Sequence, residues 1–228
     1  MNKFAFFFLV FVCSLPSLVV LADQSEIDLS TLVSIRLDII DAEEGDAQAS
    51  FRLGDRYYFG DGVARDLEKA VHWIQLSAEQ GYPPAQYYLG VMYYTGEGVV
   101  QDYQEAVKWS RMSAEQGYAP AQFNMGVFYA DGKGVTQDFQ EAVKWYRLSA
   151  AQGHSPAQNN LGSMYANGQG VIQNYVLAHM WYNIAASQGN SNAVENRRLL
   201  ASSTMTAQQI AEAQQLAREC LNRNLKNC

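Results

Sequence analysis

The sequence repeats itself with a period of 36 residues. A Gln-Gly pair at Gln80-Gly81 returns at positions 116–117, 152–153 and 188–189. Between these pairs the same residues recur in register, as the series Tyr57, Tyr93, Tyr129 and Tyr165, the series Gly60, Gly96, Gly132 and Gly168, and the series Trp73, Trp109, Trp145 and Trp181. A strict period of this length is typical of a solenoid, in which one supersecondary unit is stacked several times. The functional question therefore concerns the surface that the repeats build.

Each repeat has the pattern of two helices joined by a glycine turn. In residues 81–116, Pro83 suits a helix start, where its missing N–H costs nothing, and Gly96 is a typical C-terminal cap. Asp102 then caps a second helix, with Glu105 in the capping-box position three residues later. Because one hairpin cannot bury its apolar face alone, neighbouring hairpins are expected to stack. The predicted fold is all-α, an α-solenoid of antiparallel helix hairpins.

The pattern divides the chain into repeats and two caps without an internal linker. Four full repeats are expected at residues 45–80, 81–116, 117–152 and 153–188. Residues 23–44 resemble the second half of a repeat, with Ser30 at the cap position, and are expected to form an N-terminal cap helix. Residues 189–228 resemble a degenerate repeat followed by a C-terminal capping helix that begins after Thr206. Because terminal units must face water, polar outer faces are expected at both ends.

Residues 1–22 have the composition of a secretory signal peptide. Lys3 supplies a positive charge, Phe4 to Leu15 is an almost unbroken apolar run, and Val20-Leu21-Ala22 offers a cleavage site. We therefore predict a periplasmic or secreted protein with no stable membrane insertion after cleavage. The alternative is an uncleaved N-terminal anchor, because the apolar stretch is nearly long enough to span a thin bilayer.

Two cysteines, Cys220 and Cys228, lie near the C-terminal end of the sequence. In an exported protein such a pair suggests a disulfide. On a continuous helix, residues eight apart lie about 12 Å apart, which is too far for a bond. The disulfide therefore requires the helix to end near Leu221. Free thiols or an intermolecular link are the alternatives.

The residues of the repeat carry a family resemblance. From Ala85 to Gly117 the chain follows the pattern Ala-x3-Leu-Gly-x2-Tyr-x2-Gly-x-Gly-Val-x2-Asp-x3-Ala-x2-Trp-x4-Ala-x2-Gly, which resembles the Sel-one-like repeat, a relative of the tetratricopeptide repeat. The resemblance covers about residues 30–200, and the stretch 205–213 is similar to the closing helix of bacterial members. It implies a right-handed superhelix that serves as an adaptor in protein complexes. Exported bacterial members that resemble this chain are linked to host interaction, envelope assembly or signalling.

The resemblance favours a non-enzymatic scaffold for protein–protein interaction, expected to be a monomer, with a protein or peptide as its partner. A cysteine-rich branch of the same family has been reported to bind or hydrolyse β-lactams, and we keep such an enzyme as the alternative. That branch carries a disulfide in most repeats, whereas none of the four repeats here contains a cysteine.

The first helix of each hairpin packs through its Leu-Gly-x2-Tyr face and carries another stripe of residues half a turn away. Because first helices line the concave side in such stacks, this other stripe is the predicted binding surface. Its members, called the inner stripe below, are Phe51, Asp55, Tyr58, Tyr87, Val91, Tyr94, Phe123 and Val127. Aromatic rings with a polar tip dominate binding hot spots. Towards the fourth repeat the stripe becomes small and polar. The alternative is that these rings pack between adjacent repeats, and their exposure distinguishes the two interpretations.

Charge and motifs argue against several other functions. The chain holds 23 acidic and 16 basic residues, for a net charge of −7, which argues against nucleic acid as a partner. The three histidines lack metal-ligand spacing. The Gly-x-Gly-Val turns lack the preceding strand and the lysine of a phosphate loop, and no Gly-x-Ser-x-Gly nucleophile motif occurs. No catalytic residue, metal site or cofactor is predicted.

Overall fold

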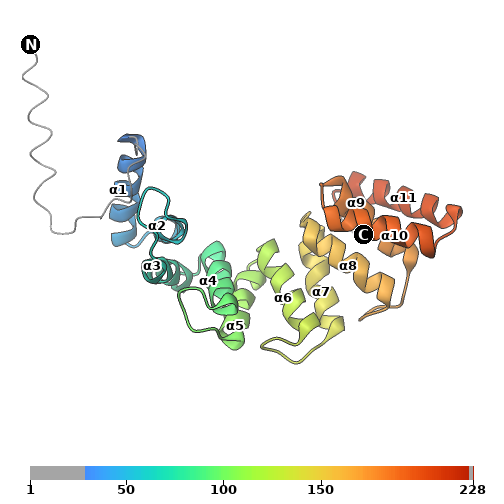
Figure 1. The fold of residues 1–228 in the computed structure, drawn as a ribbon, viewed down its shortest axis with the longest axis horizontal. Helices are drawn as coiled ribbons and strands as arrows, with labels where there is room; N and C mark the ends of the chain where they lie inside the picture. The colour runs from blue at the N-terminus through green and yellow to red at the C-terminus, as the bar shows by residue number, and fades with distance from the viewer. Residues whose placement is uncertain (1–28, 226–227) are drawn as a thin grey trace, which may run out of the picture.

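The structure is a computed structural model that describes residues 29–225 and 228. Within this part of the chain, eleven helices and no strand are found (Figure 1). They are α1 (Leu29–Glu43), α2 (Ala47–Phe59), α3 (Leu67–Glu79), α4 (Pro83–Thr95), α5 (Tyr103–Glu115), α6 (Ala119–Asp131), α7 (Phe139–Ala151), α8 (Ser155–Asn167), α9 (Tyr175–Ser187), α10 (Ser191–Ser203) and α11 (Ala207–Asn222). The predicted all-helical solenoid is confirmed. The predicted signal peptide, residues 1–22, lies outside the described residues.

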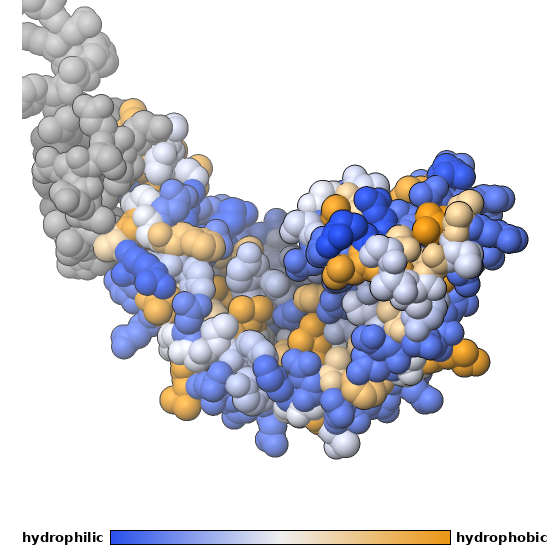
Figure 2. Space-filling view, turned by 45° about the vertical axis from the view of Figure 1, so that its right-hand side comes forward, coloured by the Kyte–Doolittle hydropathy of each residue, from blue (hydrophilic) through white to orange (hydrophobic). Residues whose placement is uncertain are grey.

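The helices follow one another along an arc. Contacts are densest within the hairpins α2–α3, α4–α5, α6–α7 and α8–α9, and each hairpin also packs against the next. The two ends of the arc rise on the same side, and α2 and α4 lie nearer this side than α3 and α5 (Figure 1). Figure 2 shows the hollow between the two arms of the arc. The first helices of the early repeats therefore border the hollow, as expected for a concave binding side.

Glycine turns and side-chain caps set the helix ends in every repeat, and the cap is aspartate in the first three repeats and Asn174 in the fourth. Gly96 ends α4 with φ 78°, in the left-handed region that glycine adopts most easily, and its N–H donates to the Met92 carbonyl. The Asp102 carboxylate accepts from the N–H groups of Gln104 and Glu105 at the start of α5. The same pair of signals recurs 36 residues on, which keeps each turn to a few residues.

The predicted capping box at Glu105 is wrong. The N–H of Asp102 donates instead to the Tyr93 carbonyl at 2.9 Å, so it needs no side-chain acceptor. The Glu105 carboxylate accepts from Lys108 Nζ at 2.9 Å. An equivalent backbone bond ties Asp138 to Tyr129, and it fixes where the second helix leaves the turn.

Small residues allow the two helices of a hairpin to approach closely. Ala85, Ala106 and Ala114 are almost completely buried. A Cβ atom at Gly90 would lie 2.5 Å from Ser110 Oγ and 3.0 Å from the Ala106 carbonyl oxygen, so a side chain there would push α4 and α5 apart. The buried core therefore combines these small residues with large side chains such as Leu89 and Met125, and it forms three hydrophobic clusters along the stack.

The N-terminal cap differs from expectation in two ways. Ser30 lies inside α1 rather than at its cap, because the helix already includes Leu29. The outer face of α1 is apolar, with Leu29, Val33 and Leu37 exposed by 76%, 50% and 54%. The expected polar face is wrong at this end. α1 packs on α2 as the second helix of a hairpin would, and the described residues contain no first helix to cover its other side.

The C-terminal cap follows the sequence closely. Thr206 and Gln209 form a capping box at the start of α11. The helix ends at Asn222, and a disulfide joins Cys220 to Cys228, whose Cα atoms are 5.7 Å apart. The helix end thus allows the two cysteines to meet. None of the helices in residues 29–225 combines the length and the apolarity needed to cross a membrane.

Candidate partner-binding surface

The eight residues of the inner stripe lie on the first helices of three successive hairpins. Phe51, Asp55 and Tyr58 are on α2, Tyr87, Val91 and Tyr94 are on α4, and Phe123 and Val127 are on α6. All eight side chains are half-buried. The structure therefore places them along the stack as a row, with part of each side chain packed and part open to solvent.

Rings at one repeated position of the stripe pack against the following hairpin. The pairs, with the distances between ring centroids, are Phe51–Tyr82 at 5.6 Å, Tyr87–Tyr118 at 5.5 Å and Phe123–His154 at 5.1 Å. In each pair the second ring follows the first by 31 residues and stands directly before a first helix. Aromatic pairs at such distances contribute about 0.5–1.5 kcal/mol beyond area burial. Packing between repeats thus accounts for the buried part of these rings.

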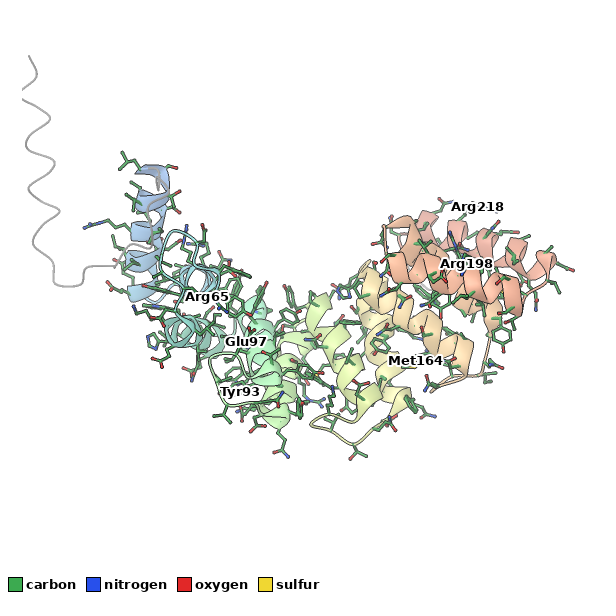
Figure 3. The ribbon with its side chains drawn as sticks, in the orientation of Figure 1. Arg65, Tyr93, Glu97, Met164, Arg198 and Arg218 are labelled. Carbon is green, nitrogen blue, oxygen red and sulfur yellow. A yellow bond between two sulfur atoms is a disulfide. The ribbon has the colours of Figure 1, made fainter. Side chains whose placement is uncertain are left out.

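Tyrosines at a second repeated position reach the glycine turn of the next hairpin. The Tyr58 hydroxyl donates to the Glu97 carboxylate, and Lys133 Nζ donates to the Tyr94 hydroxyl at 2.6 Å. Both partners lie 39 residues further along the chain. Glu97 is labelled in Figure 3, in the turn after α4. These bonds raise the pKa of Tyr58 and the pKa of Lys133. They also place the charged groups of Glu97 and Lys133 beside the tyrosine hydroxyls of the stripe.

Asp55 is the acidic member of the inner stripe. Partial burial raises the pKa of its carboxyl, the nearby Asp61 raises it further, and Arg56 opposes both effects. The same position holds Val91 in the second repeat and Val127 in the third. The stripe is therefore charged on α2 and apolar on α4 and α6.

Burial shifts the pKa of several groups outside the inner stripe, among them His154, His179 and Tyr146. His179 is buried, with its Nδ1 3.0 Å from Asn183 Nδ2, and burial lowers the pKa of His179 and of His154. Burial also raises the pKa of Tyr146 to about 12, so this phenol stays protonated at neutral pH. Among residues 29–225 and 228, no group of three or more His, Cys, Asp or Glu side chains is arranged to hold a metal ion.

A ladder of paired glutamines was missed by the sequence analysis. Buried Gln86 donates to the Ala78 carbonyl and accepts from Gln116 Nε2 at 2.8 Å. The equivalent pairs in the next two repeats are Gln122 with Gln152 and Gln158 with Gln188. The signal was present, because the Gln-Gly series marks one partner and Gln86, Gln122 and Gln158 repeat with the same period. The ladder supplies hydrogen-bond donors to backbone carbonyl groups where one hairpin joins the next, such as those of Ala78 and Gly81.

A buried ion pair at the first junction was also missed. Asp38 on α1 is 4% exposed and accepts from Arg52 Nε at 2.7 Å and from Arg56 Nε at 2.9 Å. Arg56 also donates to Ser34 Oγ. No repeat carries an equivalent ion pair in its sequence, since Ile74 takes the place of Asp38 in the first repeat. The ion pair holds the cap helix α1 on α2. It could not be predicted from the repeat pattern, because it occurs once.

The stacked hairpins and the recurring glycine turns define a helical-repeat solenoid. The Sel1 repeat model matches the chain four times, at residues 47–82, 83–118, 119–154 and 155–190. The chain belongs to the Sel1 repeat family. Proteins of this family are generally non-enzymatic scaffolds, and their repeats are associated with protein–protein interaction.

Solved structures with the same fold support this assignment. A protective antigen of uropathogenic Escherichia coli with an SLR fold is 39% identical, with a TM-score of 0.74 over 81% of this chain and 40% of that chain. A Sel1 repeat protein from Oxalobacter formigenes is 33% identical, with a TM-score of 0.70 over 82% of this chain and 78% of that one. The immunity protein PA5088 from Pseudomonas aeruginosa, 22% identical with a TM-score of 0.52 over 90% and 78% of the two chains, shares the fold. The chain thus spans less than half the length of its E. coli relative. No match was found among curated proteins.

Proposed function

We propose that the protein is an exported, non-enzymatic scaffold that binds a partner protein or peptide through the inner stripe. The observation that carries the proposal is the half-buried state of all eight stripe residues along the first helices. The five aromatic members are held against the next hairpin by ring contacts or hydrogen bonds, so little conformational entropy is lost when a partner covers their exposed parts. Rigid aromatic side chains of this kind are enriched in binding hot spots.

Two observations support export to the periplasm or the cell exterior. Residues 1–22 have the composition of a signal peptide, and a disulfide joins Cys220 to Cys228, as is common in oxidising compartments. The E. coli relative is a protective antigen, which supports a role in host interaction. Assembly of a complex in the cell envelope is the other setting in which such a scaffold would act.

Affinity capture with matched charge variants tests the proposal. The purified protein is offered cell-envelope extract and candidate host proteins, beside a Val91→Lys variant in the inner stripe and a Leu148→Lys variant on α7. Leu148 is 50% exposed and lies on a second helix, away from the stripe. Circular dichroism first establishes that both variants fold.

We expect a partner that the wild type and Leu148→Lys retain and that Val91→Lys loses, because the lysine places a charge within the apolar part of the stripe. A partner retained by Val91→Lys and lost by Leu148→Lys would place binding on the second helices and contradict the proposal. β-Lactam turnover by the purified protein would contradict its non-enzymatic character.

A further inference from the structure

A pocket opens at the junction between the third and fourth repeats. Its volume is about 350 Å³, and its lining comes from the end of α6, the turn before α7, α7 itself, α8 and the turn after α8. The lining residues are Ala130, Asp131, Gln137, Phe139, Tyr146, Asn160, Ser163, Met164 and Gln169. Met164 is labelled on α8 in Figure 3. The pocket continues the inner stripe, because Ala130 is the third-repeat counterpart of Tyr58 and Tyr94.

The preceding junction shows what this position holds elsewhere in the chain. There the Tyr94 ring lies 5.4 Å from the Tyr103 ring and 5.7 Å from the Phe128 ring, between ring centroids. Its hydroxyl accepts from Lys133 Nζ, which also lies 5.0 Å from the ring centre. A tyrosine of the chain thus fills the junction between the second and third repeats.

Each residue around Tyr94 has a counterpart in the pocket wall 36 residues further on. Tyr103 corresponds to Phe139, Phe128 to Met164 and Lys133 to Gln169, and all three counterparts line the pocket. The tyrosine itself corresponds to Ala130. The pocket therefore lies where the preceding junction holds the Tyr94 ring. The counterparts of the residues around that ring line the pocket, and the methyl group of Ala130 takes the place of the ring.

The polar end of the pocket also matches a phenol. At the first two junctions the tyrosine hydroxyl meets Glu97 and Lys133, and Gln169 holds the same position of the repeat at the third. A glutamine amide both donates and accepts, so Gln169 can bond a phenol hydroxyl in either direction. Ser163, which lines the pocket, stands at the repeat position that the larger Val127 holds in the third repeat.

We propose that this pocket binds the side chain of a tyrosine in the partner peptide, with the ring against Phe139 and Met164 and the hydroxyl at Gln169. Aromatic–aromatic and sulfur–aromatic contacts favour the ring in this place. The inference rests on the proposed function and specifies one anchor of the partner. The partner side chain replaces the ring that the chain supplies at the first two junctions.

The test uses 4-methylphenol, which is the tyrosine side chain without its backbone, titrated into ¹⁵N-labelled protein and followed by NMR. We expect shifts of amides around Ala130, Ser163 and Gln169, with the millimolar affinity usual for so small a ligand. The Ala130→Tyr variant restores the tyrosine of the other junctions. It is expected to weaken binding at least tenfold and to raise the melting temperature. Ser163→Val, which copies Val127, is a second, milder variant that should weaken binding several-fold.

Two short peptides then separate a peptide anchor from a site for free phenols. Capped Gly-Tyr-Gly should shift the same amides, and capped Gly-Phe-Gly should bind several-fold more weakly because it lacks the hydroxyl. Binding of 4-methylphenol without binding of Gly-Tyr-Gly would overturn the peptide assignment. No binding of any probe, or equal binding by wild type and a folded Ala130→Tyr variant, would overturn the pocket. These results do not depend on capture of a partner, so the pocket and the proposed function can fail separately.

Discussion

At the scale of single residues, neighbouring serines on α5 have opposite roles. Ser113 Oγ donates to the Pro83 carbonyl at 2.7 Å, a bond that recurs in the hairpins before and after it. Ser110 is also completely buried, but its hydroxyl has no hydrogen-bond partner within the described residues. A buried polar group without a partner costs about 1–3 kcal/mol, whereas a made bond contributes about 1 kcal/mol.

Substitution of these serines therefore gives effects of opposite sign. Ser110→Ala is expected to raise the free energy of unfolding by about 1 kcal/mol, and Ser113→Ala to lower it by about the same amount. Urea denaturation of both variants measures the difference on one helix. An equal loss of stability in the two variants would show that the Ser110 hydroxyl is satisfied in solution.

Asp55 leads to a pH-dependent prediction. Partial burial raises the pKa of its carboxyl in the folded state, so the folded protein binds this proton more tightly than the unfolded chain. The ionised carboxylate therefore lowers stability above its folded pKa, and this penalty disappears as the pH falls below the unfolded value of about 3.9. Asp55→Asn is expected to raise the melting temperature at pH 7, and the gain should shrink towards pH 4. If the gain in melting temperature grew as the pH fell, the pKa of Asp55 would be lowered rather than raised in the folded state.

At the scale of elements, the approach of α4 to α5 depends on a glycine. In an open helix, Gly90→Ala would stabilise by up to about 1 kcal/mol through helix propensity. Here the new Cβ would lie 3.0 Å from the Ala106 carbonyl oxygen, so the helices must separate. We expect a net loss of about 1–3 kcal/mol, measured by urea denaturation. The double variant Gly90→Ala/Ser110→Ala should remain destabilised, because the backbone contact persists. A stabilised Gly90→Ala would contradict the close packing.

The disulfide of the C-terminal cap is expected to act locally. In a solenoid each unit contacts its neighbours alone, so the loss of one end does not unfold the whole stack. Reduction of Cys220–Cys228 should speed amide hydrogen exchange in α11 and leave α4 to α7 unchanged. Exchange measured by mass spectrometry, with and without reductant, checks this. Faster exchange along the whole chain would show one cooperative unit instead.

At the scale of the whole molecule, the sequence predicts the repeated features and the C-terminal cap, whereas two features that depart from the period at a single place could not be predicted. The helix hairpins and the glycine turns follow from residues that recur every 36 positions, such as Gly96 and Asp102. The glutamine ladder was equally periodic, but a polar series is easily taken for surface. The Asp38 ion pair and the Ala130 pocket are single departures from the period. They could not be predicted because the residues that surround Asp38 and Ala130 are known only from the packed structure.

The inner stripe shows the same limit. Its register could be predicted, because Phe51, Tyr87 and Phe123 share one position of the repeat. Their half-buried state could not, since it depends on how far each hairpin rotates against the next. The sequence leaves packing between repeats and binding of a partner as alternatives for these rings. In the structure one part of each ring is packed, and the other part is exposed to solvent.

The central claim is that a partner binds the inner stripe, and site-specific photocrosslinking in living cells tests it most directly. A photoreactive side chain is placed at Val91 on the stripe or at Leu148 on the second-helix side. The account predicts that one discrete adduct forms from position 91 and that it is absent from position 148. A discrete adduct from position 148 with none from position 91 would contradict the account.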